Sequence, residues 1–251
     1  MDRSTPPPDA PPGDTPDRPT APAEVRQRWR LTFRRSADPA SPPAREVIAA
    51  WEAGLGSSGL PIAGMDLPVP RLRIAFGAPI QPGIAADGEL VDLFLTARLP
   101  VADVRAAVRA AMPPGHELVD LRDVWLGEPA LPGQVVAADY RVRVRTIDGS
   151  PVDLTACRAG CQRLLAAGSL PRSREKGGRM VAYDLRPLVA ALDVVAVDLD
   201  GLVNLRVRTR FDPERGVGRP EEVVAALADA VGTNFEISDL VRERLLLSGE
   251  A

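Results

Sequence analysis

Residues 71–96 read R-L-R-I-A-F-G-A-P-I-Q-P-G-I-A-A-D-G-E-L-V-D-L-F-L-T. The runs R-L-R-I-A-F and E-L-V-D-L-F-L-T at its two ends have the composition of β-strands. The residues between them include Pro79, Pro82, Gly83 and Gly88, which favour turns and loops. We therefore expect a hairpin with a long connection, and the elements before and after it can be placed around this pair of strands.

The residues around this hairpin predict a β-α-β-β-α-β unit. In residues 25–35 the apolar side chains alternate with Arg26, Arg28, Arg30 and Arg34, which indicates a strand with one buried and one wet face. Apolar residues at helical spacing predict helices at 45–55 and 101–112, and residues 117–126 read as a further strand.

A similar order of elements follows a Pro- and Gly-containing linker at residues 127–134. Asp200-Gly201 suits a tight hairpin turn between two of the predicted strands. The elements expected here are strands at 138–146, 180–185, 193–199 and 202–211 and from Phe235 onward, helices at 153–167 and 220–231, and a basic loop at 171–179.

These elements predict an α+β fold of two tandem ferredoxin-like (split βαβ) antiparallel-sheet units, at residues 24–127 and 135–248, with an extra strand in the second. The repeat rests on element order, because similarity of sequence between the halves is not evident. Residues 1–23 carry eight prolines and predict a disordered tail, or alternatively a ligand for a proline-recognition domain.

Composition argues against several classes of protein. The net charge of −3 supplies no general attraction to nucleic acid or acidic membranes, so any such affinity has to come from a local patch. We find no apolar run long enough to cross a bilayer and no signal-peptide core. Two cysteines are too few for a disulfide framework, so we expect a reducing, cytoplasmic setting.

Short motifs in a characteristic order extend over residues 25–248. They include Leu60-Pro61, residues 70–76, Pro79, Pro82-Gly83, Gly88-Glu89 with Asp92, Ala138-Asp139-Tyr140-Arg141, Tyr183-Asp184-Leu185-Arg186-Pro187, and Gly218-Arg219-Pro220 through Val223. Together they resemble the radical-SAM-linked protein family, a domain of unknown function found alone or fused behind a radical S-adenosylmethionine (SAM) enzyme, often one with a cobalamin-binding region. The resemblance implies motif residues at Gly83, Gly88, Glu89, Asp92, Asp184, Arg186 and Arg219.

The chain departs from this family at three polar positions. The family's Ser-His-Leu-Asp is here Asp38-Pro39-Ala40-Ser41-Pro42-Pro43, and its Gly-Phe-Asn-Pro is Gly64-Met65-Asp66-Leu67-Pro68. An acid and a serine before the Gly-Glu pair are replaced by Ala85 and Ala86. If those groups bind a ligand or react in relatives, we expect that activity to be lost here.

The cysteines and the histidine indicate no cofactor or metal. Cys157 and Cys161 form C-x-x-x-C, but Leu164 stands where a radical-SAM cluster needs a third thiolate, so the chain cannot be the radical enzyme. Four residues apart on a predicted helix, they are most simply core residues. His116, the single histidine, has no second ligand nearby, and we expect it at the surface or at the start of a strand.

Two acidic motif residues and two arginine stripes remain as candidates. Glu89 and Asp92 are expected on opposite strand faces, with Glu89 paired to a strand arginine. Arg141, Arg143 and Arg145 share one strand face, Arg206, Arg208 and Arg210 share another, and Arg172, Arg174, Lys176 and Arg179 lie in the basic loop. If these arginines are unpaired, the stripes could bind RNA phosphates. RNA-binding sheets generally also expose aromatic residues that stack on bases, and none alternate with these arginines. Alternatively they form a solvated face or pair with acids.

We expect a non-catalytic accessory protein with no cofactor of its own, which presents RNA, such as tRNA, to a radical-SAM enzyme. The alternative is a protein–protein docking module that does not touch nucleic acid. An independent enzyme is the weakest hypothesis, because no nucleophile–base pair or metal-binding set can be assembled from these residues.

Overall fold

The computed structural model describes residues 23–38, 40, 42–79 and 81–250. Apart from Ala23, the predicted tail lies outside these residues. The first half of the chain has the predicted order of elements: β1 (Gln27–Arg35), α1 (Ala44–Gly56), β2 (Ile74–Phe76), β3 (Ala85–Leu95), α2 (Val101–Ala111) and β4 (His116–Asp123).

The strands of the first half lie in the order β4-β1-β3-β2, and all neighbours are antiparallel. The predicted hairpin is present as β2 and β3, with Ala75 opposite Asp92. Trp29, Leu31 and Phe33 of β1 lie on the face of the sheet that α1 and α2 cover, and they are buried there with Trp51 of α1. This face forms the core of the first half.

The second half contains β5 (Val135–Thr146), α4 (Leu154–Ala166), β6 (Pro171–Lys176), β7 (Arg179–Asp184), a 3-10 turn η1 (Arg186–Leu188), β8 (Val189–Val197), β9 (Val203–Asp212), β10 (Gly216–Val217), α5 (Pro220–Val231) and β11 (Phe235–Leu247). Its strands lie in the order β11-β5-β9-β8, again with antiparallel neighbours, and β10 pairs with the end of β9. Buried residues of α4 and α5 form the core of this half with the strands.

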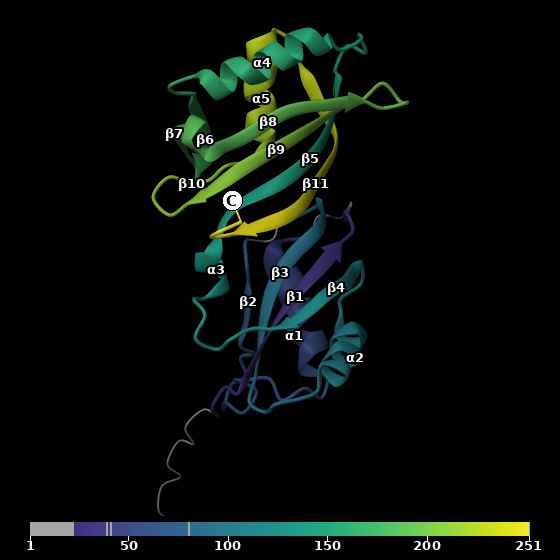
Figure 1. Ribbon diagram of the computed structural model, residues 1–251, viewed down its shortest axis with the longest axis vertical. Coiled ribbons are helices and arrows are strands. Elements are labelled where there is room, and N and C mark those ends of the chain that lie inside the picture. Colours follow the sequence, from purple (N-terminus) through teal and green to yellow (C-terminus); the bar gives the residue numbers. More distant parts are fainter. Residues whose placement is uncertain (1–22, 39, 41, 80, 251) are drawn as a thin grey trace, which may run out of the picture.

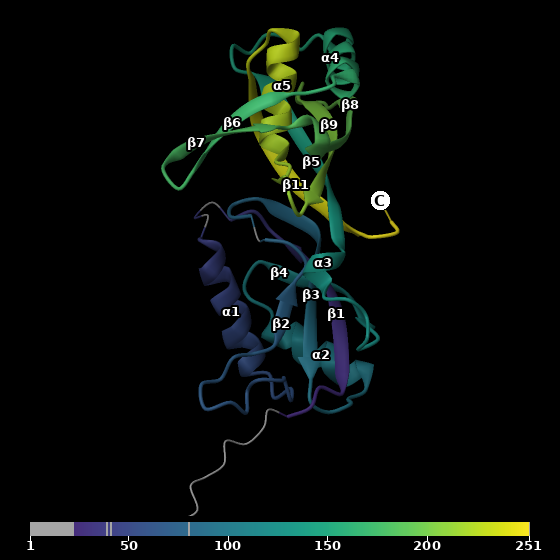
Figure 2. The same ribbon diagram turned by 90° about the vertical axis from the view of Figure 1, so that its left-hand side faces the viewer.

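The prediction of a basic loop at residues 171–179 is wrong. These residues form β6 and the start of β7, an antiparallel hairpin whose turn is made by Gly177 and Gly178, both with positive φ. The hairpin forms its own two-stranded sheet and projects from the side of the second half (Figure 2). The strand expected at 180–185 therefore belongs to this hairpin and not to the main sheet.

The two halves share one sheet, which corrects the prediction of purely antiparallel units. Val241 and Arg242 of β11 pair in parallel with Ala85 and Ala86 of β3. A Cβ at Gly88 would lie 2.8 Å from the carbonyl oxygen of Glu243, so glycine permits this close approach of β3 and β11. The halves lie one above the other along the long axis of the molecule, with the end of β11 at their junction (Figure 1).

The described residues thus form an α+β fold with five helices and a nine-stranded mixed sheet. The predicted linker contains the short α3 (Leu131–Gln134), which leads into β5. Across the part of the chain that the structure describes, we find no helix with the length and apolar character that a membrane crossing requires.

Candidate functional site

Four buried polar side chains meet where the two halves join. Arg35 ends β1, Glu89 lies in β3, Tyr140 in β5 and Arg242 in β11, and each is at most 5% exposed. We call these four residues the junction cluster. Arg242 donates from Nε to Glu89 Oε1 at 2.8 Å, which confirms the expected pairing of Glu89 with a strand arginine.

The junction cluster holds two guanidinium groups and one carboxylate. Burial is the largest single influence on Arg242 and lowers its pKa, but Glu89 and Tyr140 together hold that pKa above its ordinary value. Burial dominates at Arg35, whose pKa is lowered, and Arg242 adds to this effect by repulsion. Burial likewise raises the pKa of the Tyr140 hydroxyl. The cluster therefore carries an excess positive charge in the interior.

A pocket of about 330 Å³ opens beside the cluster on the side of the second half. We call it the junction pocket. Arginines from three separate elements reach it: Arg174 of β6, Arg219 just before α5, and Arg242 of β11. Its other lining residues are Pro79, Gln81, Glu175, Phe211 and Val217.

Two of these arginines have no carboxylate partner among the described residues. The guanidinium carbon of Arg174 lies 4.8 Å from the centre of the Tyr183 ring, a cation–π distance. Arg219 is exposed at the start of α5 and forms no ion pair with a described residue. The pocket therefore presents guanidinium groups that remain available to an anion.

The two arginine stripes lie on one face of the second half, as predicted, with Arg141 directly opposite Arg206 in the β5–β9 register. Four of the six are already paired with acids. The pairs are Arg141 with Glu243 at 2.8 Å, Arg143 with Asp198 at 2.5 Å, Arg145 with Glu236 at 2.8 Å, and Arg208 with Asp139 at 2.6 Å.

Arg206 and Arg210 are the exceptions on this face. Arg206 is exposed and has no ion pair with a described residue, and Arg210 donates to the carbonyl oxygen of Pro187 at 3.1 Å. In the β6–β7 hairpin, Arg172 pairs with Asp229 at 2.6 Å. The side chain of Lys176 lies outside the described part of the structure. Of the alternatives considered for these six arginines, pairing with acids describes most of the face and an open guanidinium face does not.

The motif residues of the family resemblance separate into two groups. Glu89 and Arg219 lie at the junction, and Gly83, with positive φ, lies in the β2–β3 connection near it. Asp184 and Arg186 are structural instead. The Asp184 carboxylate accepts from the amides of Leu170 and Arg186, and the Arg186 side chain donates to the carbonyl oxygen of Leu165 in the last turn of α4.

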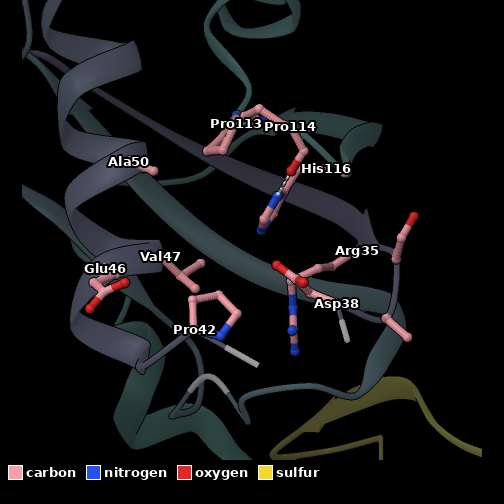
Figure 3. A pocket seen from close by; sticks show the side chains of 12 residues that line it. Arg35, Asp38, Pro42, Glu46, Val47, Ala50, Pro113, Pro114 and His116 are labelled. Atoms are coloured by element: carbon pink, nitrogen blue, oxygen red, sulfur yellow. Dashed lines mark hydrogen bonds between the residues drawn. The ribbon is translucent and has the colours of Figure 1, made fainter. Parts of the chain in front are cut away.

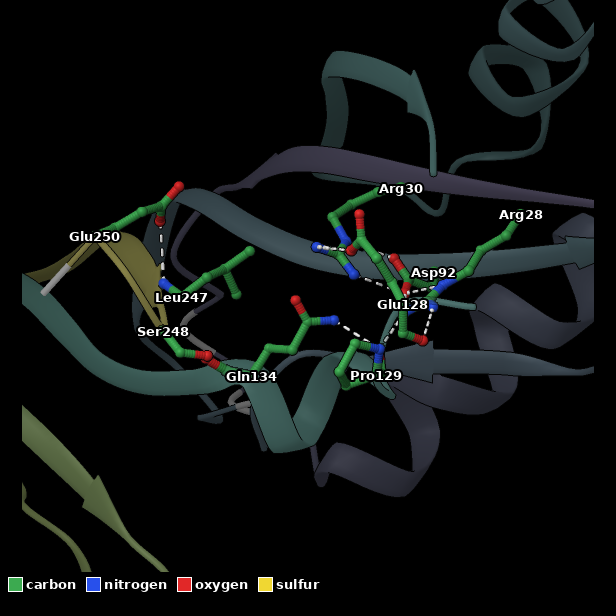
Figure 4. A network of polar contacts seen from close by, with 9 residues as sticks. All are labelled: Arg28, Arg30, Asp92, Glu128, Pro129, Gln134, Leu247, Ser248 and Glu250. Atoms are coloured by element: carbon green, nitrogen blue, oxygen red, sulfur yellow. Dashed lines mark hydrogen bonds and ion pairs between the residues drawn. The ribbon is translucent and has the colours of Figure 1, made fainter. Parts of the chain in front are cut away.

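Asp92 lies on the opposite face of β3 from Glu89, as predicted, and it holds Arg28 and Arg30 of β1 at Nε–O distances of 2.8 Å (Figure 4). The prediction that Arg28 and Arg30 are wet is wrong, since both are 2% exposed. Arg28 also donates to the carbonyl oxygens of Glu128 and Pro129. The connector between the halves covers this face, and the three charges anchor it.

A second pocket, of about 430 Å³, lies between the end of β1, α1 and the turn before β4 (Figure 3). We call it the α1 pocket. Arg35 of the junction cluster and His116 both line it. His116 opens β4 as predicted, but it is half-buried against Trp51 rather than at the surface. Burial lowers its pKa, so the ring is neutral at pH 7.

The cysteines behave as core residues. Cys157 and Cys161 are free thiols of α4 that are 2% and 3% exposed. Burial raises the pKa of Cys161 to about 11. No group of three or more His, Cys, Asp or Glu side chains in the described ranges is placed to hold a metal ion.

Sequence reasoning did not single out Arg35, Arg242 or the junction pocket, and it named Tyr140 only within a family motif. A charged residue such as Arg242 inside a strand with many leucines was a usable signal, because an arginine in a buried strand needs a partner. The strand pattern alone does not reveal that the partner is Glu89.

A family model described as an uncharacterized protein conserved in bacteria (DUF2344) matches residues 46–217. No curated protein matches the chain. Among solved structures, a Cbf5-Nop10-Gar1 complex is 12% identical with a TM-score of 0.48, covering 86% of this chain and 49% of that one.

A protein of unknown identity from Galdieria sulphuraria is 13% identical with a TM-score of 0.26, covering 84% of this chain and 96% of that one. An H/ACA RNP bound to a substrate RNA containing 2'-deoxyuridine is 12% identical with a TM-score of 0.47, covering 86% and 47%. This chain spans about half the length of the Cbf5-Nop10-Gar1 and H/ACA RNP chains that it matches.

Proposed function

The chain belongs to the DUF2344 family of uncharacterized proteins conserved in bacteria, and from this starting point we propose that it is a non-catalytic accessory protein that binds RNA at the junction pocket and presents it to a radical-SAM enzyme. We interpret its halves, residues 24–127 and 135–248, as two ferredoxin-like units. The equivalent strand orders β4-β1-β3-β2 and β11-β5-β9-β8 support this interpretation.

The observation that carries the RNA proposal is the convergence of Arg174, Arg219 and Arg242 on one pocket. Planar guanidinium groups bind phosphate oxygens through two parallel hydrogen bonds, and neutralised phosphates account for most affinity of proteins for RNA. Two carboxylates lie near these arginines: Glu175 in the pocket lining and Glu89 in the junction cluster. They balance only part of the positive charge, because Arg35 adds a fourth guanidinium group.

The sheet face with the arginine stripes contributes less to this function. Each paired arginine would have to break its ion pair with a carboxylate before it could bind a phosphate. Because one anion replaces another, the net gain in binding free energy is small. Arg206 and Arg210 are the stripe members without a carboxylate partner among the described residues. We therefore place RNA contacts first at the junction pocket and second at these two side chains.

The radical-SAM partner is proposed from the ordered motifs between residues 25 and 248 that resemble the radical-SAM-linked family. Leu164 in place of a third cluster cysteine is consistent with a supporting role. Co-purification with a radical-SAM enzyme from the source cell tests this part, and absence of such an enzyme from the purified complex counts against it.

RNA binding is tested by fluorescence anisotropy with labelled tRNA over a series of salt concentrations. Two variants remove the same charge: Arg174→Ala with Arg219→Ala at the pocket, and Arg206→Ala with Arg210→Ala on the sheet face. We expect the pocket variant to bind more weakly and to lower the slope of log K against log salt by about 2. The face variant should change both quantities less.

Two outcomes contradict the proposal. Absence of tRNA binding by the native protein at low salt would contradict the RNA function, and a larger loss of affinity in the face variant would place the RNA site on the sheet face instead of in the pocket.

The ion-paired state of Arg141, Arg143, Arg145 and Arg208 favours the alternative, a docking module without nucleic acid. A partner complex that survives nuclease treatment, together with no tRNA binding, would establish that alternative.

A further inference from the structure

The α1 pocket has the size and lining of a small-molecule site. Its volume of about 430 Å³ lies within the range of pockets that hold small organic ligands. The lining is largely apolar, with Val47, Ala50, Pro113 and Pro114 among its residues. Figure 3 shows Val47 and His116 directed toward the same space between α1 and the end of β1.

Arg35 brings an incompletely paired charge to this pocket. The side chain is 95% buried, and its Nη2 donates a hydrogen bond to the carbonyl oxygen of Gln81 at 2.9 Å. Among the described residues its Nε has no hydrogen-bond partner and its guanidinium forms no ion pair. Glu89 and Asp38 attract the Arg35 guanidinium through space, but the Glu89 carboxylate is hydrogen-bonded to Arg242. A buried guanidinium without a hydrogen-bonded carboxylate of its own is costly.

His116 adds an acceptor. Its Nδ1 lies 3.0 Å from the carbonyl oxygen of Pro114, and since a carbonyl only accepts, Nδ1 carries the proton. In the neutral ring Nε2 is then an acceptor that is buried with no partner among the described residues, so a donor reaches it only when the side chains over it move aside. The Phe33 and Trp51 rings, each with its centre 5.7 Å from that of His116, fix the position of the imidazole.

The charges at the rim limit the ligand. Asp38 and Glu46 also line the pocket, and both are exposed. Their negative charges oppose a doubly charged anion such as phosphate, whereas a single carboxylate suits one unpaired guanidinium. The apolar lining leaves room for a hydrocarbon group.

From these observations we infer that the α1 pocket binds a small monocarboxylate with an apolar side chain and a hydrogen-bond donor next to the carboxylate. Arg35 holds the carboxylate, His116 Nε2 accepts from the donor, and Val47, Ala50 and the prolines surround the side chain. A hydroxyl and an ammonium group both satisfy the donor position, so 2-hydroxy acids and amino acids share the required chemistry. This inference does not rest on the proposed RNA function, although Arg35 belongs to the junction cluster as well as to this pocket.

Isothermal titration calorimetry of the full chain with 2-hydroxyisocaproate tests the inference, with leucine as the ammonium counterpart. We expect saturable binding of at least one of the two. The amide of the bound compound should bind at least about tenfold more weakly through loss of the charge, and 4-methylpentanoate should bind more weakly through loss of the donor. Inorganic phosphate should not compete.

Variants separate the pocket from general effects on folding. Arg35→Met should weaken binding at least about tenfold, the loss of one charged hydrogen-bonding group. To separate binding from stability, Ala50→Phe fills the pocket from an exposed position of α1, and Ala49→Phe is its matched control outside the lining. Ala50→Phe should abolish binding and Ala49→Phe should preserve it, while tRNA binding is the same in both.

The inference is overturned if neither carboxylate binds, if the amide binds as well as the acid, if phosphate competes equally, or if Ala50→Phe binds like Ala49→Phe. None of these results bears on the tRNA titration, so the two proposals fail separately.

Discussion

Glu89 and Arg242 are 153 residues apart in the sequence and form a buried ion pair, with Arg242 Nε 2.8 Å from Glu89 Oε1. Glu89 belongs to β3 of the first half and Arg242 to β11 of the second. The pair lies beside the parallel pairing of β11 with β3, where the two halves share one sheet. It therefore couples the two halves energetically.

Loss of the Glu89 charge should destabilise the protein strongly. Glu89→Gln leaves Arg242 and Arg35 buried without a carboxylate in the junction cluster, and breaking a buried pair in this way costs about 3–5 kcal/mol. Denaturant unfolding followed by circular dichroism measures this loss. Glu117→Gln is the matched control, because Glu117 pairs with Arg34 at an exposed site, 3.1 Å apart. Equal losses in the two variants would show that the buried pair has no special weight.

Asp92→Asn should release the connector between the halves. The substitution removes the charge that Arg28 and Arg30 share, and Arg28 also holds the carbonyl oxygens of Glu128 and Pro129. We expect faster amide hydrogen exchange in residues 124–134, with a loss of about 3–5 kcal/mol in unfolding free energy. The neighbouring Asp123→Asn, on an exposed carboxylate, should leave exchange in this segment unchanged. Unchanged exchange in Asp92→Asn would refute the anchoring role.

His116 should make stability depend on pH. Burial lowers its pKa from 6.5 in the folded protein, so the unfolded chain binds more protons as the pH falls. This contribution to stability is complete above about pH 6.5 and is lost as the pH falls through the folded-state pKa. The charge of Arg35 lowers the pKa of His116 further, and the charge of Glu89 raises it. Unfolding free energies measured between pH 5 and 7.5 should show this slope. In His116→Phe the slope should be smaller, and an unchanged slope would assign it to other groups.

The thiols should be unreactive in the folded protein. Burial raises the pKa of Cys161 to about 11 and also raises that of Cys157, so few thiolates exist at pH 8. Iodoacetamide should alkylate both cysteines rapidly in denaturant and very slowly in native buffer, as measured by intact mass. Rapid native labelling would mean that α4 opens easily or that the thiols have a chemical role.

The sequence alone was sufficient for most of the elements, because the periodicity of apolar residues is a local property. The helix predicted at residues 220–231 has those bounds in α5, and the order of strands and helices in the first half was correct. Strand β6 was missed because most of its residues are polar, so no apolar alternation marks them as a strand, whereas β7 corresponds to the strand predicted at 180–185.

The partners of the charged residues were decided by the tertiary structure. Alternation placed Arg141, Arg143 and Arg145 on one strand face, but the carboxylates that neutralise them come from β11 and from the β8–β9 turn. Likewise, no local pattern links Arg35, Glu89, Tyr140 and Arg242, which come from four strands. Local sequence specifies which face a side chain occupies, whereas ion pairs and pockets depend on which distant strands become neighbours when the chain folds.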